Sequence, residues 1–144
     1  MVGYFPPLVK QVTASGAELT VIERRDDLTG AMDGLTITLD PAALRACTKV
    51  LTTSTVLLND TLESVLAHGA HAQAFVMIGP GGGCLPDALF ARGLTALGGT
   101  WIEDVDGFRD AIRSGEPWGR HARKTLVEAA TYPGLDALLA RLAT

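Results

Sequence analysis

The chain has 144 residues and a formal net charge of −4, with 47% hydrophobic and 19% charged residues. That length suits one domain, and this apolar fraction excludes a disordered chain. The net charge is negative and the sequence has no basic stripe, so we expect no nucleic-acid partner.

The N-terminal residues and the cysteines indicate a cytoplasmic protein. Residues 1–7 have neither the basic nor the apolar region of a signal peptide, and no apolar run approaches the roughly 20 residues of a membrane span. The two cysteines, Cys47 and Cys84, form no Cys-x-x-Cys pair, which suits a reducing compartment. We therefore expect a cytoplasmic location and no membrane partner.

In chain order, short β-branched runs alternate with amphipathic stretches. Pro6 and Pro7 suit the first turn of a helix that stops at Gly16. Strands are predicted at 19–22, 49–53, 74–78 and 99–102, with an edge or hairpin strand of period two at 35–39. Further helices are predicted from Pro41, after Asp60, from Pro86, over 105–114 and after Pro133. Asp60 and Glu63 have the spacing of a capping box. The alternation predicts one Rossmann-like α/β domain over residues 1–144, with a mostly parallel sheet flanked by helices.

The first strand of this sheet is truncated. Only residues 1–5 precede the first helix, although the first strand of such folds usually lies at the centre of the sheet. We expect an incomplete or rearranged centre, or pairing with another protomer, because an open strand edge invites partners. A homo-oligomer is therefore the expected assembly.

Ligands of open α/β sheets bind beyond the carboxyl ends of the strands, and polar residues follow two of the predicted strands there. Glu23 follows residues 19–22, where a carboxylate would suit a hydroxyl, a metal or an amine, or would belong to a solvated charged loop. Thr53, Ser54 and Thr55 follow residues 49–53, and Asn59 lies near the next helix N-terminus. These residues predict either a polar pocket that tolerates anions or simple helix capping.

A glycine-rich loop follows the predicted strand 74–78. Its residues Gly79, Pro80, Gly81, Gly82 and Gly83 would let main-chain N–H groups approach a phosphate or carboxylate, or would form a flexible connector. No Gly-Lys-Ser/Thr follows, and residues 3–6 are not Gly-x-Gly-x-x-Gly, so the sequence has no nucleotide fingerprint.

Three kinds of side chain could bind a metal. Cys84 is the better placed cysteine for a soft metal ion, or it is a small packed thiol. His68 and His71 could share a metal or could stabilise a helix end, and His121 lies in a basic run that would cover an anion or face solvent. No catalytic triad order and no His-Glu-x-x-His occurs, so the catalytic residues are unknown.

Several motifs together resemble one family, the heavy-metal chelation domain that was first defined as a domain of unknown function. They are Val2-Gly3-Tyr4-Phe5-Pro6-Pro7-Leu8-Val9, Thr53-Ser54-Thr55 with Asn59-Asp60-Thr61-Leu62, Gly79-Pro80, and Leu85-Pro86-Asp87-Ala88-Leu89-Phe90, and the likeness extends to about Ile112. The resemblance implies a Rossmann-like fold that usually follows a smaller domain like the N-terminal domain of enolase, with a site between the two. We expect that companion domain to be absent from residues 1–144.

The sequence and the resemblance leave three hypotheses about function. The first is a module that binds a small ligand or a heavy-metal chelate in a cleft at the carboxyl ends of the strands, with a transition-metal ion or metal chelate as cofactor. The alternative is the catalytic half of an enzyme, a transferase or lyase acting on a metal-binding small molecule, which requires the missing companion domain. The third is a purely structural or assembly domain.

Overall fold

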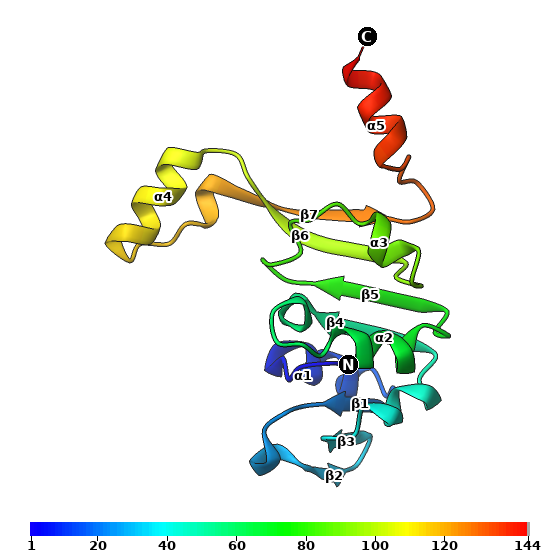
Figure 1. Cartoon of the computed structure of the whole chain (residues 1–144). Helices are drawn as coiled ribbons and strands as arrows, with labels where there is room; N and C mark the ends of the chain where they lie inside the picture. The colour runs from blue at the N-terminus through cyan, green and yellow to red at the C-terminus, as the bar shows by residue number, and fades with distance from the viewer. Residues whose placement is uncertain (144) are drawn as a thin grey trace.

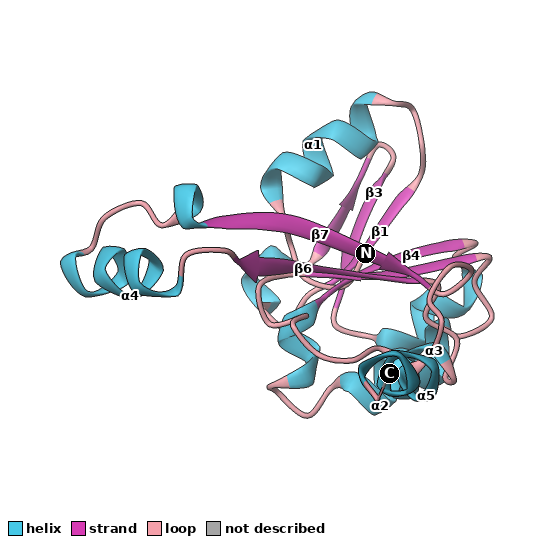
Figure 2. Cartoon of the chain, turned by 90° about the horizontal axis from the view of Figure 1, so that it is seen from above, coloured by secondary structure: helices cyan, strands magenta, loops and turns pink. Residues whose placement is uncertain are grey.

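The computed structural model describes residues 1–143 as one sheet with helices on both faces (Figures 1 and 2). The strands are β1 (Leu19–Ile22), β2 (Gly30–Met32), β3 (Leu35–Thr38), β4 (Lys49–Thr53), β5 (Ala74–Ile78), β6 (Ala96–Ile102) and β7 (Ala122–Glu128). The α-helices are α1 (Pro6–Ala14), α2 (Leu62–Gly69), α3 (Asp87–Phe90), α4 (Val105–Ser114) and α5 (Leu135–Leu142). Short 3-10 helices are η1 (Asp26–Leu28), η2 (Pro41–Ala46), η3 (Ser54–Leu57) and η4 (Gly119–His121).

The sheet is mostly parallel. One part has the order β1-β3-β2 and the other β4-β5-β6-β7, and only β2 and β7 run antiparallel to their neighbours. This confirms the predicted α/β class with helices on both faces. β2 and β3 form the hairpin expected around residues 35–39, with β3 also pairing in parallel with β1.

Val2 joins the two parts of the sheet. It forms parallel bridges with Ile22 of β1 and with Thr52 of β4. The Val2 N–H donates to the Leu51 carbonyl at 2.8 Å, and the Ile22 N–H donates to the Met1 carbonyl at 2.8 Å. The central strand is thus shortened to a few residues, as expected, and the gap is closed within the chain.

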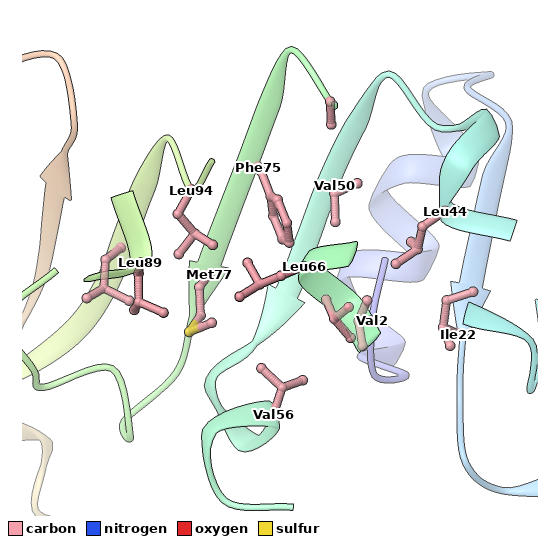
Figure 3. Close-up of a cluster of buried hydrophobic side chains, with 13 residues drawn as sticks. Val2, Ile22, Leu44, Val50, Val56, Leu66, Phe75, Met77, Leu89 and Leu94 are labelled. Atoms are coloured by element: carbon pink, nitrogen blue, oxygen red, sulfur yellow. The ribbon is translucent and has the colours of Figure 1, made fainter. Parts of the chain in front are cut away.

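Alternation along the strands sends side chains into two clusters, one on each face of the sheet. On one face α2, α3 and η2 cover buried side chains that include Leu44, Leu66, Phe75 and Met77 (Figure 3). On the other face α1 packs a second cluster of Met1, Val9, Val21 and Leu35. Neighbours such as Val21 and Ile22 therefore belong to different clusters, because successive strand residues point to opposite faces.

Two local predictions were wrong in detail. Asp60 is not the N-cap of α2: it has a φ of 58°, and Thr61 takes that position without a capping side chain. Glu63 instead forms an ion pair with Arg92, so the predicted capping box does not form. The helix expected from Pro41 is the 3-10 helix η2, whose start is capped by the side chain of Asp40.

The β6–β7 hairpin extends beyond the rest of the sheet. Residues 96–98 of β6 pair with β5, whereas residues 99–102 pair with β7 alone. This ribbon carries α4 away from the body of the molecule (Figures 1 and 2), and α4 spans the predicted residues 105–114 and ends at Gly115, which has a left-handed conformation. None of the helices in residues 1–143 has the length and apolar character that crossing a bilayer requires.

Candidate functional site

A cavity of about 550 Å³ opens at the carboxyl ends of β1, of the short segment around Val2 and of β4. These three segments are neighbours in the sheet and run parallel, so their ends meet at one edge. The cavity is lined by Val2, Gly3, Tyr4, Phe5, Ile22, Glu23, Arg24, Leu39, Pro41, Thr53, Thr55, Val56, Asn59, Thr61, Ser64 and Val65. It therefore occupies the place that the topology predicts for a ligand.

The cavity combines an apolar floor with a wall of hydroxyl groups. Val2, Ile22 and Val56 are buried core residues that also line it, and they come from three separate segments of the chain (Figure 3). In the wall, the Thr61 hydroxyl donates to Asn59 Oδ1 at 2.6 Å, and the N–H of Thr55 donates to the Thr53 hydroxyl at 3.2 Å. Pockets of this composition are typical of small-molecule sites.

Glu23 fixes the loop at the mouth of the cavity. Its Oε2 accepts a hydrogen bond from the Tyr4 N–H at 2.9 Å, and its Oε1 accepts from the N–H groups of Arg24 and Arg25 at 2.7 and 3.2 Å. The carboxylate thus ties the end of β1 to the segment that precedes α1. Its charge is compensated by three main-chain amides, and it still borders the cavity.

Sequence reasoning missed Arg24, which lines the same cavity. Its side chain makes no hydrogen bond or ion pair with residues 1–143, whereas its neighbour Arg25 is paired with Asp27 at 2.6 Å. Its position directly after Glu23, in a loop at the carboxyl end of a strand, could have identified Arg24 as a site residue. An unpaired guanidinium beside hydroxyl groups favours an anionic ligand.

The glycine loop packs against other parts of the protein instead of lining this cavity. A Cβ atom on Gly79, whose φ is 144°, would collide with the hydroxyl of the buried Ser54. A Cβ on Gly82 would lie 2.8 Å from the carbonyl oxygen of Gly98 in β6. Glycine is therefore required at these two positions for close packing. Gly81 also lies against Ser54, and Pro80 is exposed.

The predicted site residues are thus divided between two places. Glu23, Thr53, Thr55 and Asn59 line the first cavity. Gly82, Gly83 and Cys84 border a second cavity of about 510 Å³, beside Leu97, Trp101 and Tyr132. Ser54, Gly79, Pro80 and Gly81 line neither cavity and lie between them in the fold.

The residues present do not fit a metal centre made by protein side chains alone. In residues 1–143 no group of three or more His, Cys, Asp or Glu side chains is placed to hold a metal ion. Cys84 is exposed and His71 is exposed, while His68 has a buried Nδ1 with no hydrogen-bond partner. His121 lies at the base of α4, where its Nδ1 is 2.8 Å from Asp104 Oδ2.

The chain matches, over residues 1–131, the DUF364 family, whose description is "Putative heavy-metal chelation". It is 34% identical over 107 residues to an uncharacterized protein of Methanocaldococcus jannaschii. The aligned residues make up 73% of this chain and 40% of that protein. The chain thus spans well under two thirds of this relative's length.

Two solved structures of DUF364 proteins, both of unknown function, have a similar fold. The Pyrococcus horikoshii protein superposes with a TM-score of 0.74 at 21% identity, over 89% of this chain and 53% of that one. The Desulfitobacterium hafniense DCB-2 protein superposes with a TM-score of 0.69 at 22% identity, over 88% of this chain and 50% of that one. This chain spans about half the length of each, and by its sequence match it belongs to the DUF364 family.

Proposed function

We propose that this protein binds a small, anionic, hydroxyl-bearing chelating molecule, free or with its metal ion, in the first cavity. The observation that carries the proposal is the meeting of an apolar floor, a hydroxyl wall and the unpaired Arg24 at the ends of three adjacent parallel strands. The family description supports a chelate as the cargo.

The cavity suits such a ligand for chemical reasons. The Arg24 guanidinium can bind a carboxylate through two parallel hydrogen bonds. The hydroxyls of Thr55 and Ser64 can both donate to and accept from ligand hydroxyls. Because residues 1–143 provide no cluster of metal-ligating side chains, the metal would be held by the oxygen atoms of its chelator. Cys84 borders the second cavity and takes no part in this binding.

Calorimetry on the full chain tests the proposal with three probes: Ni²⁺ alone, citrate alone and the nickel–citrate complex. We expect citrate and its complex to bind and Ni²⁺ alone to bind far more weakly. Arg24→Gln should weaken citrate binding by about tenfold or more, because a hydrogen bond to a charged group contributes about 1.5–3 kcal/mol. Arg25→Gln is the matched control, since Arg25 is paired with Asp27 and does not line the cavity.

Two results would contradict the proposal. One is equal affinity of Arg24→Gln and Arg25→Gln for citrate. The other is tight binding of Ni²⁺ alone that Cys84→Ser abolishes, which would place a metal site at the second cavity instead.

We further propose that the protein is a cytoplasmic homo-oligomer. The support for the compartment is the two free cysteines, Cys84 being exposed. The support for self-association is the set of large apolar side chains that remain exposed, which includes Leu126 and Leu142.

A second candidate function is the catalytic half of an enzyme that needs a companion domain. The observation in its favour is that the chain spans about half the length of the two solved relatives. Assaying the full-length Methanocaldococcus jannaschii relative beside its segment equivalent to this chain, with nickel citrate as substrate, separates the two functions. Turnover by the full-length protein alone supports the enzyme, and equal binding without turnover by both supports the binding module.

A further inference from the structure

β7 is an edge strand whose outer side is open. It pairs with β6 on one side, and no strand of residues 1–143 pairs with it on the other. Residues of an antiparallel strand direct their main-chain groups alternately to either side. The Ala129 N–H donates to the Thr95 carbonyl, and the Glu103 N–H to the His121 carbonyl, so odd-numbered residues of β7 face β6. Lys124, Leu126 and Glu128 therefore turn their main-chain groups outward.

The side chains of the same three residues share one face of the strand. Leu126 stands between Lys124 and Glu128 and is 59% exposed. β7 is regular over seven residues and contains neither proline nor glycine. A regular edge strand with an exposed apolar residue near its centre is a template for pairing with another strand.

We propose that a second copy of this chain pairs antiparallel with β7, about a twofold axis at Leu126. In this register Leu126 faces Leu126 of the partner subunit, and Lys124 faces Glu128 of the partner subunit on both sides of the axis. The contact is isologous: each half supplies one positive charge, one apolar side chain and one negative charge in complementary order. The Leu126 N–H donates to the carbonyl of Leu126 of the partner subunit, and the reverse bond forms by symmetry.

Neighbouring registers are less favourable. An axis at Lys124 places two ammonium groups directly opposite each other, and like charges in that position destabilise a strand pair. An axis at Thr125 places Lys124 opposite the apolar Leu126 of the partner subunit. Of these three registers, only the axis at Leu126 places opposite charges across from each other.

The C-terminal helix adds a second observation. α5 projects past the β7 edge of the sheet (Figure 1), and none of its residues is buried. Leu139 and Leu142 are 53% and 83% exposed, although the helix is amphipathic. Across a β7–β7 contact, α5 extends toward the second copy, which gives its apolar face a partner.

This interface specifies the homo-oligomer proposed above but is independent of the proposed ligand. The first cavity lies at β1, Val2 and β4, whereas β7 is at the far edge of the sheet. Loss of citrate binding and loss of the dimer are measured separately, so the failure of either proposal leaves the other standing.

Sedimentation velocity of the full chain over a hundredfold range of concentration provides the test. We expect a wild-type dimer that dissociates on dilution. Lys124→Glu and Glu128→Lys should each weaken the dimer at least tenfold, because each places like charges opposite one another. An equimolar mixture of the two variants should dimerise again, since it restores both ion pairs, and the double variant should dimerise alone. Lys10→Glu on α1 is the control for an added negative charge, and circular dichroism checks that every variant is folded.

Three outcomes would overturn the proposal. The first is a wild-type monomer at every concentration. The second is a dimer that neither single variant weakens, which places the contact elsewhere. The third is a pair of weakened single variants that do not dimerise when mixed, which excludes the antiparallel register about Leu126.

Discussion

Oε2 of Glu23 accepts a hydrogen bond of 2.9 Å from the main-chain N–H of Tyr4, so the end of β1 holds the segment that precedes α1. The second oxygen of the carboxylate accepts from Arg24 and Arg25. An amide at this position cannot accept on its nitrogen. We therefore expect Glu23→Gln to lower the free energy of unfolding by about 1–3 kcal/mol, the loss that follows when hydrogen bonds to a charged group are removed.

Urea unfolding followed by circular dichroism measures this loss. Glu18→Gln is the matched control, because Glu18 is exposed and lies in the loop that leads into β1. Equal unfolding free energies for the two variants would show that Glu23 does not hold the loop.

Gly82 and Gly83 are adjacent but should respond in opposite ways to alanine. Gly82 is buried, and a Cβ atom there would lie 2.8 Å from the Gly98 carbonyl oxygen, whereas a Cβ on Gly83 meets open space. We expect Gly82→Ala to destabilise the protein by about 1–3 kcal/mol through overpacking. Gly83→Ala should be neutral or stabilising by up to about 1 kcal/mol, because it restricts the unfolded chain. Thermal unfolding checks both, and similar melting temperatures would contradict the packing described for this loop.

The side chain of Asp104 links the start of α4 to His121, the last residue of η4. Its Oδ1 accepts from the Gly107 N–H at 2.9 Å, and its Oδ2 lies 2.8 Å from His121 Nδ1. Since Arg120 Nε donates to His121 Nε2, the neutral imidazole carries its proton on Nδ1 and donates it to Asp104. Two hydrogen bonds hold the pKa of Asp104 below its usual value. The one from the Gly107 N–H has the larger effect, and the one from His121 has the smaller.

This lowered pKa predicts that the start of α4 loosens in acid. A carboxyl whose folded pKa lies below its unfolded value of about 3.9 stabilises the fold above that pH, and the stabilisation is lost as the pH falls through the folded pKa. The amide resonance of Gly107, followed by NMR from pH 6 to pH 2, should therefore shift below about pH 4. Asp104→Asn should abolish this transition, and Asp33→Asn in the β2–β3 turn should leave it intact. A transition that persists unchanged in Asp104→Asn would assign it to another group.

Asp87 anchors the chain that leads into α5. Its Oδ1 accepts from the Leu135 N–H at 2.9 Å and its Oδ2 from the Tyr132 hydroxyl at 2.8 Å, and the Tyr132 ring packs edge-on against Phe90. Both hydrogen bonds lower the pKa of Asp87, the one from the Leu135 N–H more than the one from Tyr132. The Asp87 carboxylate is therefore fully ionised at neutral pH.

Hydrogen exchange at neutral pH should therefore be faster over residues 135–142 in Asp87→Ala. Tyr132→Phe should have a smaller effect, because it removes one hydrogen bond but leaves the ring in place against Phe90. Exchange rates in α5 that are unchanged by Asp87→Ala would show that this helix is held by other contacts.

Most of the sheet could be predicted because buried parallel strands have continuous apolar sequences. Residues 74–78 have this pattern and became β5, whereas residues 49–53, which became β4, are a short run rich in β-branched residues. β7 was not predicted, since its sequence Ala-Arg-Lys-Thr-Leu-Val-Glu has charged residues on an open edge and lacks that pattern. The capping box failed because Asp60 adopts a positive φ, a conformation that tertiary context imposed and that spacing alone does not reveal.

The candidate site could be predicted only in part. That Glu23, Thr53 and Thr55 converge follows from parallel topology, which places the ends of β1 and β4 at one edge. The glycine run was predicted to contact the same ligand, but Gly79 and Gly82 are used for packing against Ser54 and β6. Sequence shows that a glycine can approach another group closely, but it does not show which group.

The seam at Val2, where this residue joins β1 to β4, is the line along which the sheet is expected to separate first. Within the sheet, β2-β3-β1 and β4-β5-β6-β7 are connected through the main chain of a few residues at the start of the chain. Partial unfolding along that line breaks fewer hydrogen bonds than separation of β4 from β5, so the two parts are expected to behave as distinct cooperative units. The first cavity straddles the same line, with Ile22 on one side and Thr53 on the other. A ligand that contacts both sides binds only the closed form. Its binding therefore raises the free energy needed to separate the two parts of the sheet.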